Sequence, residues 1–411
     1  MTSAAVVLAR CAELATVSAS PTWLERTHLT PEHRRANALA GAWMEEAGLR
    51  VWQDAAGNIC GRREGRTPGL PALLLGSHLD TVPDAGAYDG MLGVLMAIAV
   101  AERLSERALP FALEVIGFGD EEGARFGKAL LGSQAVAGSW DEHWWSLRDR
   151  DDISLLEAFE AFGLDPRRVG EAARRPEELA GYLEAHIEQG PYLEAADASL
   201  GYVTTIAGAR RFRLTVTGEA RHAGGTPYER RRDALLGAAE MVVAVERLAR
   251  AAGTIATVGR IEVQPGAVNV IAGRADLTLD LRAATDAERD RSWQEIERAL
   301  LTVCETRDLH LDVVETHRAA AAHCADGLTE AVVAGIRASG DDRPRGLWSR
   351  AGHDAMAMAE VTDVAMLFVR CHDGISHHPE ESVREIDVAR GLDAFEQAVL
   401  EVARRTAVAP A

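Results

Sequence analysis

The segment LLLGSHLDTVPDAGAYDGMLGV, residues 73–94, places reactive side chains at the point where a strand-like apolar run ends. The run stops at His78, Asp80 follows two residues later, and Asp89 stands directly before a glycine and a second apolar run. Imidazole and carboxylate groups suit zinc and manganese as ligands. The spacing therefore raises a metal site as one hypothesis, although an isolated H-x-D sequence is more often an ordinary salt bridge or a capped turn.

Residues of the same kind follow other strand-like runs. Asp120, Glu121 and Glu122 come directly after FALEVIGFG, and His377 follows DVAMLFVRC. His186 lies in GYLEAHIEQG, where apolar and polar residues alternate. Because ligands in open α/β sheets gather at the carboxyl ends of the strands, we expect these side chains to share one site.

Such a set would suit two metal ions about 3.5–4 Å apart that share a carboxylate and a water. Asp89 is the candidate for the shared carboxylate, and Asp80 is the candidate for the group that orients the ring of His78. Adjacent Glu121 and Glu122 would leave a turn in different directions, so that one binds metal while the other moves protons. Each motif alone has an ordinary structural explanation, such as a solvated acidic run for DEE. Their joint occurrence in order favours a catalytic site.

The elements that must position these residues alternate between helix and strand in the first part of the chain. PEHRRANALAGAWMEEAGL and GMLGVLMAIAVAERLSE have helical spacing, whereas ALLLGS and FALEVIGFG resemble central strands of a mixed sheet. From about residue 201 the pattern changes to strands with alternating apolar and polar residues, together with two helices near residues 233–251 and 287–307. Thr226 and Pro227 predict a further helix start. The pattern predicts an α/β catalytic domain in two parts, residues 1–205 and 318–411, with an α+β domain inserted at 206–317.

The charge and the cysteine content indicate which partners and which cellular compartment to expect. Acidic residues number 63 against 44 basic ones, for a net charge of −19. Such a surface disfavours nucleic acid and anionic membranes. The five cysteines are scattered and form no C-x-x-C pair, which is typical of a reducing compartment. The amino terminus does not resemble a signal peptide and no apolar run approaches the roughly 18 residues of a membrane span, so we expect a cytoplasmic protein.

Seven ordered motifs resemble the dinuclear metallohydrolases of the aminoacylase and carboxypeptidase type. They are GSHLDTV with YDGMLGV, GDEEGARF, EAHIEQGPYLE, GEARHAGGTP, NVIAGRADLTLDLR, AGHDAMAM and GISHHPEE. Within that type the chain is similar to the hydantoinase/carbamoylase branch, which holds allantoate, ureidoglycolate and N-carbamoyl-L-amino acid hydrolases. The resemblance implies a mixed central sheet flanked by helices and an inserted lid that also dimerises.

The resemblance also assigns roles in the catalytic domain. Two divalent ions, Mn²⁺ or Zn²⁺, would be held by His78 and His186 on one side, Glu122 and His377 on the other, and Asp89 as the bridge. Glu121 would be the general base that deprotonates the attacking water and passes the proton to the leaving nitrogen. A cis peptide bond would join Asp89 to Gly90.

Further residues implied by the resemblance would contact the substrate. His222 would reach over from the partner subunit of a homodimer and stabilise the oxyanion. Asn269 and Arg282, together with the backbone of Gly352, would clamp the substrate carboxylate. Gln189 would contact the ureido group. The expected substrate is thus a small anionic ureido acid.

Two departures from the family pattern concern substrate choice. Related enzymes carry SGAGHD where this chain has SRAGHD, so Arg350 stands beside the proposed carboxylate clamp. The family's HAGTTPM is HAGGTPY here, with Gly225 and Tyr228. Arg350 either points to solvent or adds a cation to the pocket.

Several activities are compatible with these motifs. Allantoate hydrolysis, with release of ammonia and carbon dioxide, is favoured because three stretches most resemble bacterial allantoate enzymes: DAAGNICGRREG, AYDGMLGVLMAIA and VRCHDGISHHPEESV. Hydrolysis of N-carbamoyl-L-amino acids is the first alternative. A dipeptidase or aminoacylase would share the metal site, but HIEQG and the Asn269–Arg282 pair argue against it. A non-catalytic binding protein on the same scaffold is a remote alternative, because decay should have removed a ligand or the base.

Overall fold

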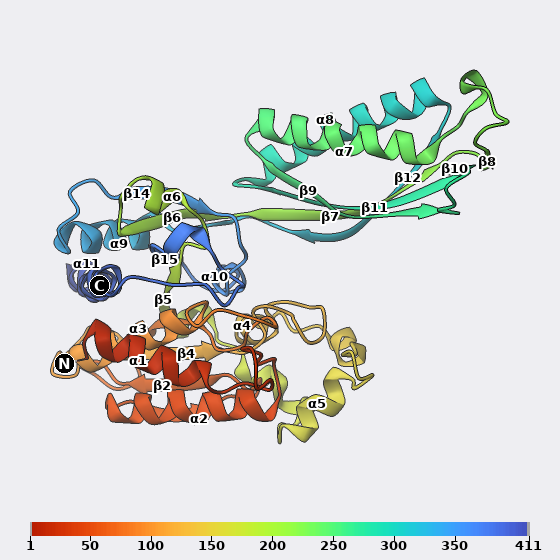
Figure 1. Cartoon of the computed structure of the whole chain (residues 1–411). Helices are drawn as coiled ribbons and strands as arrows, with labels where there is room; N and C mark the ends of the chain where they lie inside the picture. The colour runs from red at the N-terminus through yellow and green to blue at the C-terminus, as the bar shows by residue number, and fades with distance from the viewer. Residues whose placement is uncertain (1, 409–411) are drawn as a thin grey trace. The chain divides into compact units, whose positions relative to one another are not determined.

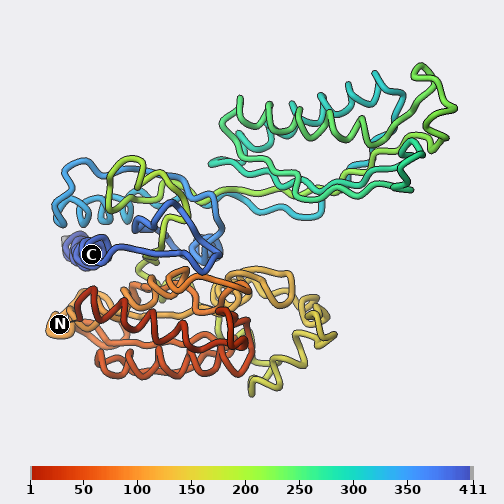
Figure 2. The backbone as a smooth tube through the Cα atoms, viewed as in Figure 1, coloured from red at the N-terminus to blue at the C-terminus, as the bar shows by residue number. Residues whose placement is uncertain are grey.

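The computed structural model describes residues 2–408, and they form two compact units. The first contains the described residues up to Thr204, then His323–Leu347 and the chain from Ala351 onward, whereas the second contains Thr205–Ala322 and Trp348–Arg350. Both ends of the described part of the chain, red and blue in Figure 2, belong to the first unit. The second unit thus begins one residue before the predicted insert and continues past its predicted end at His317, because the strand there runs on to Ala319.

A mixed sheet forms the centre of the first unit (Figure 1). In the described residues its nine strands are β1 (Arg50–Gln53), β2 (Ile59–Arg63), β3 (Ala72–His78), β4 (Ala112–Phe118), β5 (Leu179–Ile187), β6 (Leu200–Ile206), β13 (Ala322–His323), β14 (Arg345–Ser349) and β15 (Val364–Val369). The order is β1-β2-β4-β3-β5-β15-β6-β13, and β14 pairs with β6. Neighbours among β4, β3, β5 and β15 run parallel, while β1, β2 and β6 pair antiparallel. The predicted mixed α/β fold is confirmed.

Helices flank this sheet. They are α1 (Ala4–Ala15), α2 (Pro31–Glu46), α3 (Met91–Arg103), α4 (Leu131–Ala137), α5 (Leu155–Ala161), α6 (Tyr192–Ala195), α9 (Asp326–Ala338), α10 (Ala355–Met358) and α11 (Glu385–Val408). α3 packs on β3, β4 and β5, and its residues from Met91 to Ala101 are all buried, as its apolar sequence predicts. The Cβ of any larger residue at Gly93 would lie 2.0 Å from the carbonyl oxygen of Ala185, so only glycine allows α3 to lie this close to β5.

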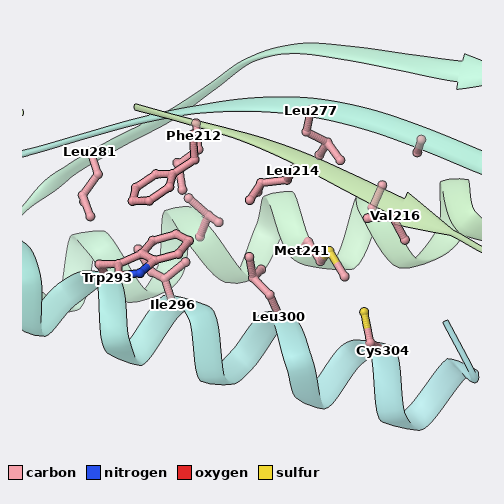
Figure 3. Close-up of a cluster of buried hydrophobic side chains, with 14 of the residues drawn as sticks. Phe212, Leu214, Val216, Met241, Leu277, Leu281, Trp293, Ile296, Leu300 and Cys304 are labelled. Carbon is pink, nitrogen blue, oxygen red and sulfur yellow. The ribbon is translucent and has the colours of Figure 1, made fainter. Parts of the chain in front are cut away.

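The second unit is a small α+β structure with its own core. Its strands and helices are β7 (Gly208–Thr217), β8 (Arg221–His222), β9 (Ile255–Gln264), β10 (Val270–Ile271), β11 (Arg274–Ala283), β12 (His310–Ala319), α7 (Ala234–Ala252) and α8 (Asp286–Arg307). The sheet has the order β12-β7-β11-β9, and α7 and α8 cover one of its faces (Figure 1). Figure 3 shows the apolar layer between them, where the rings of Phe212 and Trp293 stack with centroids 3.7 Å apart. Both helices lie where the sequence pattern predicts them.

The sequence predicted a helix start at Thr226, but no helix begins there. A short 3₁₀ turn runs from Tyr228 to Arg230, and α7 begins only after Asp233, whose side chain accepts a hydrogen bond from the N–H of Leu236. The hydroxyl of Thr226 instead donates to the carbonyl oxygen of His222 at 2.9 Å. The Thr226 hydroxyl therefore bonds to the earlier residue His222 instead of capping a helix that follows it.

Two further expectations concern cysteines and membrane spans. The five cysteines are all free and buried, as their scattered positions indicate. Among the described residues, no helix is both long and apolar enough to cross a bilayer.

Candidate active site

The parallel strands bring the predicted side chains to one edge of the sheet. β3 ends at His78, the turn after β4 carries Glu121 and Glu122, and His186 is the penultimate residue of β5. His377 lies in the loop after β15. Because β4, β3, β5 and β15 are adjacent and parallel, their carboxyl ends meet at the same edge.

Asp89 lies at the centre of this group. Its Oδ1 is 3.2 Å from Nε2 of His186 and 3.8 Å from Nε2 of His78, and its Oδ2 is 3.0 Å from Nε2 of His377. The same His377 nitrogen is 3.3 Å from Oε1 of Glu122. The structure thus brings together six side chains that we call the strand-end cluster: His78, Asp89, Glu121, Glu122, His186 and His377.

Three overlapping groups within the strand-end cluster have ligand atoms within 4.8 Å of one another. They are His78–Asp89–His186, Asp89–Glu122–His377 and His78–Glu121–Glu122. The first two groups share Asp89, one of whose oxygens faces each group. This is the arrangement that a bridging carboxylate between two ions requires.

The chemistry of the donors fits divalent metal ions. Oδ1 of Asp89 and Nε2 of His186 are buried and have no hydrogen-bond partner among the described residues. Asp89 and then Glu122 raise the pKa of His377 to about 10. Burial would raise the pKa of Asp89, but contacts with His186 and His377 hold it well below its usual range. The imidazoles and carboxylates therefore pair with one another through protons, and bound cations would take the place of those protons.

Glycine is required directly after Asp89. Gly90 has φ +72°, and a Cβ at this position would lie 2.4 Å from Nε2 of His78. The peptide bond between Asp89 and Gly90 is trans, not cis as the family resemblance implies. The positive φ of Gly90 provides the change of direction by which α3 begins at Met91.

Asp80 contacts both His78 and the turn that carries the two glutamates. Nδ1 of His78 makes its hydrogen bond with the backbone carbonyl of Asp80 at 3.0 Å, while the nearest Asp80 carboxylate oxygen is 3.6 Å away. That carboxylate instead accepts the N–H groups of Glu121 at 3.1 Å and Glu122 at 3.2 Å. Asp80 therefore holds the turn that carries both glutamates, because one of its oxygens accepts from Glu121 and the other from Glu122.

Glu121 is buried beside Glu122 without sharing its contact to His377. Burial raises the pKa of the Glu121 carboxyl well above its usual range; the charge of His78 opposes this, and the charges of Glu122 and Asp354 add to it. A Cβ at Gly352 would lie 3.7 Å from Oε1 of Glu121, so the Gly352 backbone lines the same pocket. A buried carboxyl with a raised pKa is suited to proton transfer.

Gln189 contacts the strand-end cluster directly. Its Nε2 donates to Oδ2 of Asp89 at 3.0 Å and to Oγ of Ser376 at 3.1 Å. Its Oε1 is buried and has no hydrogen-bond partner among the described residues. The amide nitrogen is therefore engaged with Asp89 and Ser376, and the oxygen remains for the ureido group that the family resemblance assigns to Gln189.

The sequence did not predict a second group of possible ligands that includes His186. Glu184, His186 and His353 are buried with ligand atoms within 4.8 Å of one another. Glu184 accepts hydrogen bonds from Ser77 at 2.8 Å and from the N–H of Ala355 at 3.1 Å. His353 follows Gly352 in the motif AGHDAMAM, from which only Gly352 was assigned a role. Its position in this motif is the signal by which the sequence could have indicated it.

His222 and Asn269 lie together in the second unit. Val270 pairs with His222 in the β8–β10 ribbon, and the N–H of Ala223 donates to the carbonyl of Asn269 at 2.9 Å. Both side chains are exposed. The N–H of Gly225 donates to Nδ1 of His222 at 3.0 Å, so a neutral ring carries its hydrogen on Nε2.

Arg282 lies at the other end of β11 from this ribbon. Arg274, next to the ribbon, pairs with Thr217, whereas Arg282 pairs with Ala209, and eight residues of strand span about 26 Å. Asn269 and Arg282 of one chain therefore lie near opposite ends of β11, whereas the resemblance implies that both contact one carboxylate. The register of β11 separates them.

Hydrogen bonds hold the Arg282 guanidinium and leave part of it available. Nε and Nη2 donate to the Asp280 carboxylate at 2.8 and 3.3 Å, and Nη1 donates to the carbonyl of Arg350 at 2.8 Å. These contacts use three of the five N–H groups of a guanidinium, and the other two have no hydrogen bond to another described residue. The Arg350 side chain lies over the Trp348 ring, 4.3 Å from its centroid, and donates to the Trp348 carbonyl.

Comparison with known sequences places this arrangement among hydrolases. The sequence model of peptidase family M20/M25/M40 matches residues 74–401 of this chain. The chain is 39% identical over 399 residues to an N-carbamoyl-L-amino acid amidohydrolase of Geobacillus stearothermophilus, covering 96% of this chain and 97% of that protein. It is 40% identical over 422 residues to a probable allantoate deiminase of Oryza sativa subsp. japonica, covering 93% and 85%.

A solved structure has the same fold over nearly the whole chain. An amidase of the hydantoinase/carbamoylase family from Burkholderia multivorans superposes with a TM-score of 0.90 at 32% identity. The superposition covers 97% of this chain and 98% of that one. The resemblance on which the predicted roles rest is therefore confirmed in sequence and in fold.

Proposed function

Because the chain belongs to peptidase family M20/M25/M40, we propose that it is a metal-dependent amidohydrolase that cleaves the ureido C–N bond of a small carboxylate substrate. The substrate we propose is allantoate, and N-carbamoyl-L-amino acids are the alternative. One observation carries the proposal: the strand-end cluster supplies two ligand groups that share Asp89, with Glu121 beside them.

The reaction needs help because a ureido carbon is a poor electrophile, since two nitrogens donate electrons into it. Two divalent ions, Mn²⁺ or Zn²⁺, held by His78, His186, Asp89, Glu122 and His377, would polarise the carbonyl and acidify the attacking water. Glu121 accepts a proton from that water and delivers it to the leaving nitrogen as the C–N bond breaks. The products are the amine and a carbamic acid, which decomposes to ammonia and carbon dioxide.

In this proposal, residues of the second unit stabilise the oxyanion and bind the substrate carboxylate. The contact from Gly225 leaves Nε2–H of His222 as a donor, which is the form that stabilises an oxyanion. The loop is held by Arg231, whose guanidinium donates to the carbonyls of Ala223 at 2.7 Å and Thr226 at 3.1 Å. Arg282 offers two unused N–H groups to the carboxylate.

We propose that His222 and Asn269 act together on the substrate of a partner subunit in a homodimer. The argument is the separation along β11, because one chain does not supply both Asn269 and Arg282 to one carboxylate. A C2 dimer would bring the ribbon of one subunit to the Arg282 of the other.

Metal removal and a substrate panel test the activity. We expect protein treated with a chelator to release no ammonia from allantoate, and Mn²⁺ or Zn²⁺ to restore the release. Faster turnover of N-carbamoyl amino acids than of allantoate would favour the alternative substrate. Full activity after complete removal of metal, verified by elemental analysis, would contradict the proposal.

Mixing two inactive variants tests the shared site. Replacing His222 with alanine is expected to lower kcat about 10²- to 10³-fold, the usual effect of losing one oxyanion donor. If His222 acts across the dimer, exchanging subunits between His222→Ala and Glu121→Gln dimers creates sites that have both wild-type residues. Ammonia release should then reappear on mixing. Mixtures that stay as inactive as the separate variants, although subunits exchange, would place His222 in its own chain's site.

A further inference from the structure

Glu381 is a buried carboxylate outside the proposed ligand set. It is 4% exposed and lies in the loop that also carries His377, four residues earlier. Its contacts reach the loop before α3, which is 292 residues away in the sequence and carries Asp89. Glu381 thus joins the two loops that supply Asp89 and His377.

Both carboxylate oxygens of Glu381 are engaged. Oε1 accepts the N–H groups of Tyr88 at 2.7 Å and of Asp89 itself at 3.1 Å. Oε2 lies 3.0 Å from the hydroxyl of Ser376, and that hydroxyl is also 3.0 Å from Oδ2 of Asp89. Glu381 therefore contacts the backbone of Asp89 directly, and it shares the single hydroxyl proton of Ser376 with the Asp89 side chain.

The packing around Glu381 leaves little freedom. A Cβ at Gly86 would lie 2.3–2.4 Å from atoms of the Glu381 side chain. The Asp89 loop therefore approaches the carboxylate so closely that glycine is required at residue 86. Gln189 closes the same network, because its amide donates to both Asp89 and Ser376.

We propose that Glu381 is a positioning residue, which orients Asp89 relative to His377 so that the two groups can hold neighbouring metal ions. This inference rests on the proposed metal-dependent function. Glu381 does not bind metal in this account. It acts by accepting two backbone N–H groups at one oxygen and one hydroxyl at the other.

The proposal predicts that metal affinity depends on acceptor geometry at residue 381. Glu381→Ala should weaken Mn²⁺ binding about 10- to 100-fold, the usual effect of removing a group that orients a metal ligand. Glu381→Gln keeps an oxygen for both N–H groups and an amide for Ser376, so its affinity should stay close to that of the unmutated protein. Raising Mn²⁺ should restore much of kcat in Glu381→Ala, whereas a purely structural defect would not respond to metal.

The test is calorimetric titration of Mn²⁺ into metal-stripped protein, followed by kcat and KM at low and saturating Mn²⁺. Glu380→Ala is the matched control, because that neighbouring glutamate is exposed. Ser376→Ala removes one contact and keeps both backbone N–H groups paired, so it should weaken Mn²⁺ binding less than Glu381→Ala. If Glu381→Ala does not fold, the Mn²⁺ affinity of Ser376→Ala tests the proposal in its place.

Three results would overturn the inference while the unmutated protein still binds Mn²⁺ and releases ammonia. They are unchanged affinity in Glu381→Ala, equal losses in Glu381→Ala and Glu381→Gln, or unchanged affinity in Ser376→Ala when Glu381→Ala does not fold. An unmutated protein that binds no Mn²⁺ would remove the proposed function and this inference together.

Discussion

Glu121→Gln is expected to lower ammonia release by about 10²- to 10⁴-fold, the range that a positioned general base contributes. Glutamine has nearly the same size and keeps the backbone contact to Asp80, but it does not accept a proton from water. The Asp89–Glu122–His377 and His78–Asp89–His186 groups do not include residue 121, so both proposed metal sites should remain. The measurement is kcat beside metal content for the same preparation.

Glu160→Gln on α5 is the matched control, since Glu160 is exposed. It should have the activity of the unmutated protein. A Glu121→Gln enzyme that keeps most of its activity with its metal would show that another group moves the proton. Loss of metal along with activity would make Glu121 a ligand instead of the base.

Asp89→Asn should abolish activity and weaken metal binding more than about 100-fold, beyond the effect of removing an orienting partner. Asp89 is the residue common to both proposed metal groups, and it lies between His186 and His377. Asparagine has a similar shape but no negative charge, and only one oxygen. One of the two ions would therefore lose its ligand from residue 89.

Thermal unfolding separates this effect from a folding defect. Mn²⁺ should raise the Tm of the unmutated protein, because an ion that binds only the folded state stabilises it, and should leave the Tm of Asp89→Asn unchanged. Asp84→Asn, an exposed change in the same loop, should respond as the unmutated protein does. An Asp89→Asn protein with the full Mn²⁺-induced rise would show that Asp89 is not a shared ligand.

Local patterns predicted the elements that carry the site. The apolar runs ending at His78 and before Glu121 became fully buried parallel strands, and residues at strand ends met at one edge. Helical periodicity predicted α7 and α8 within a residue or two of their ends. These features depend on short stretches of chain, where spacing alone distinguishes helix from strand.

The contacts that the sequence did not predict join distant segments. The role of Glu381 depends on a loop 292 residues away, and the separation of Asn269 from Arg282 depends on the register of β11. The carboxylate of Asp80 accepts from two glutamate N–H groups because the turn after β4 lies against it. Spacing along one segment does not contain such information.

The most direct test of the account is to locate manganese by anomalous diffraction in crystals of the manganese-loaded protein. Two peaks about 3.5–4 Å apart are expected, one beside His78 and His186 and the other beside Glu122 and His377, with Asp89 between them. A strand-end cluster without a peak, or with a single ion that Asp89 does not contact, would contradict it.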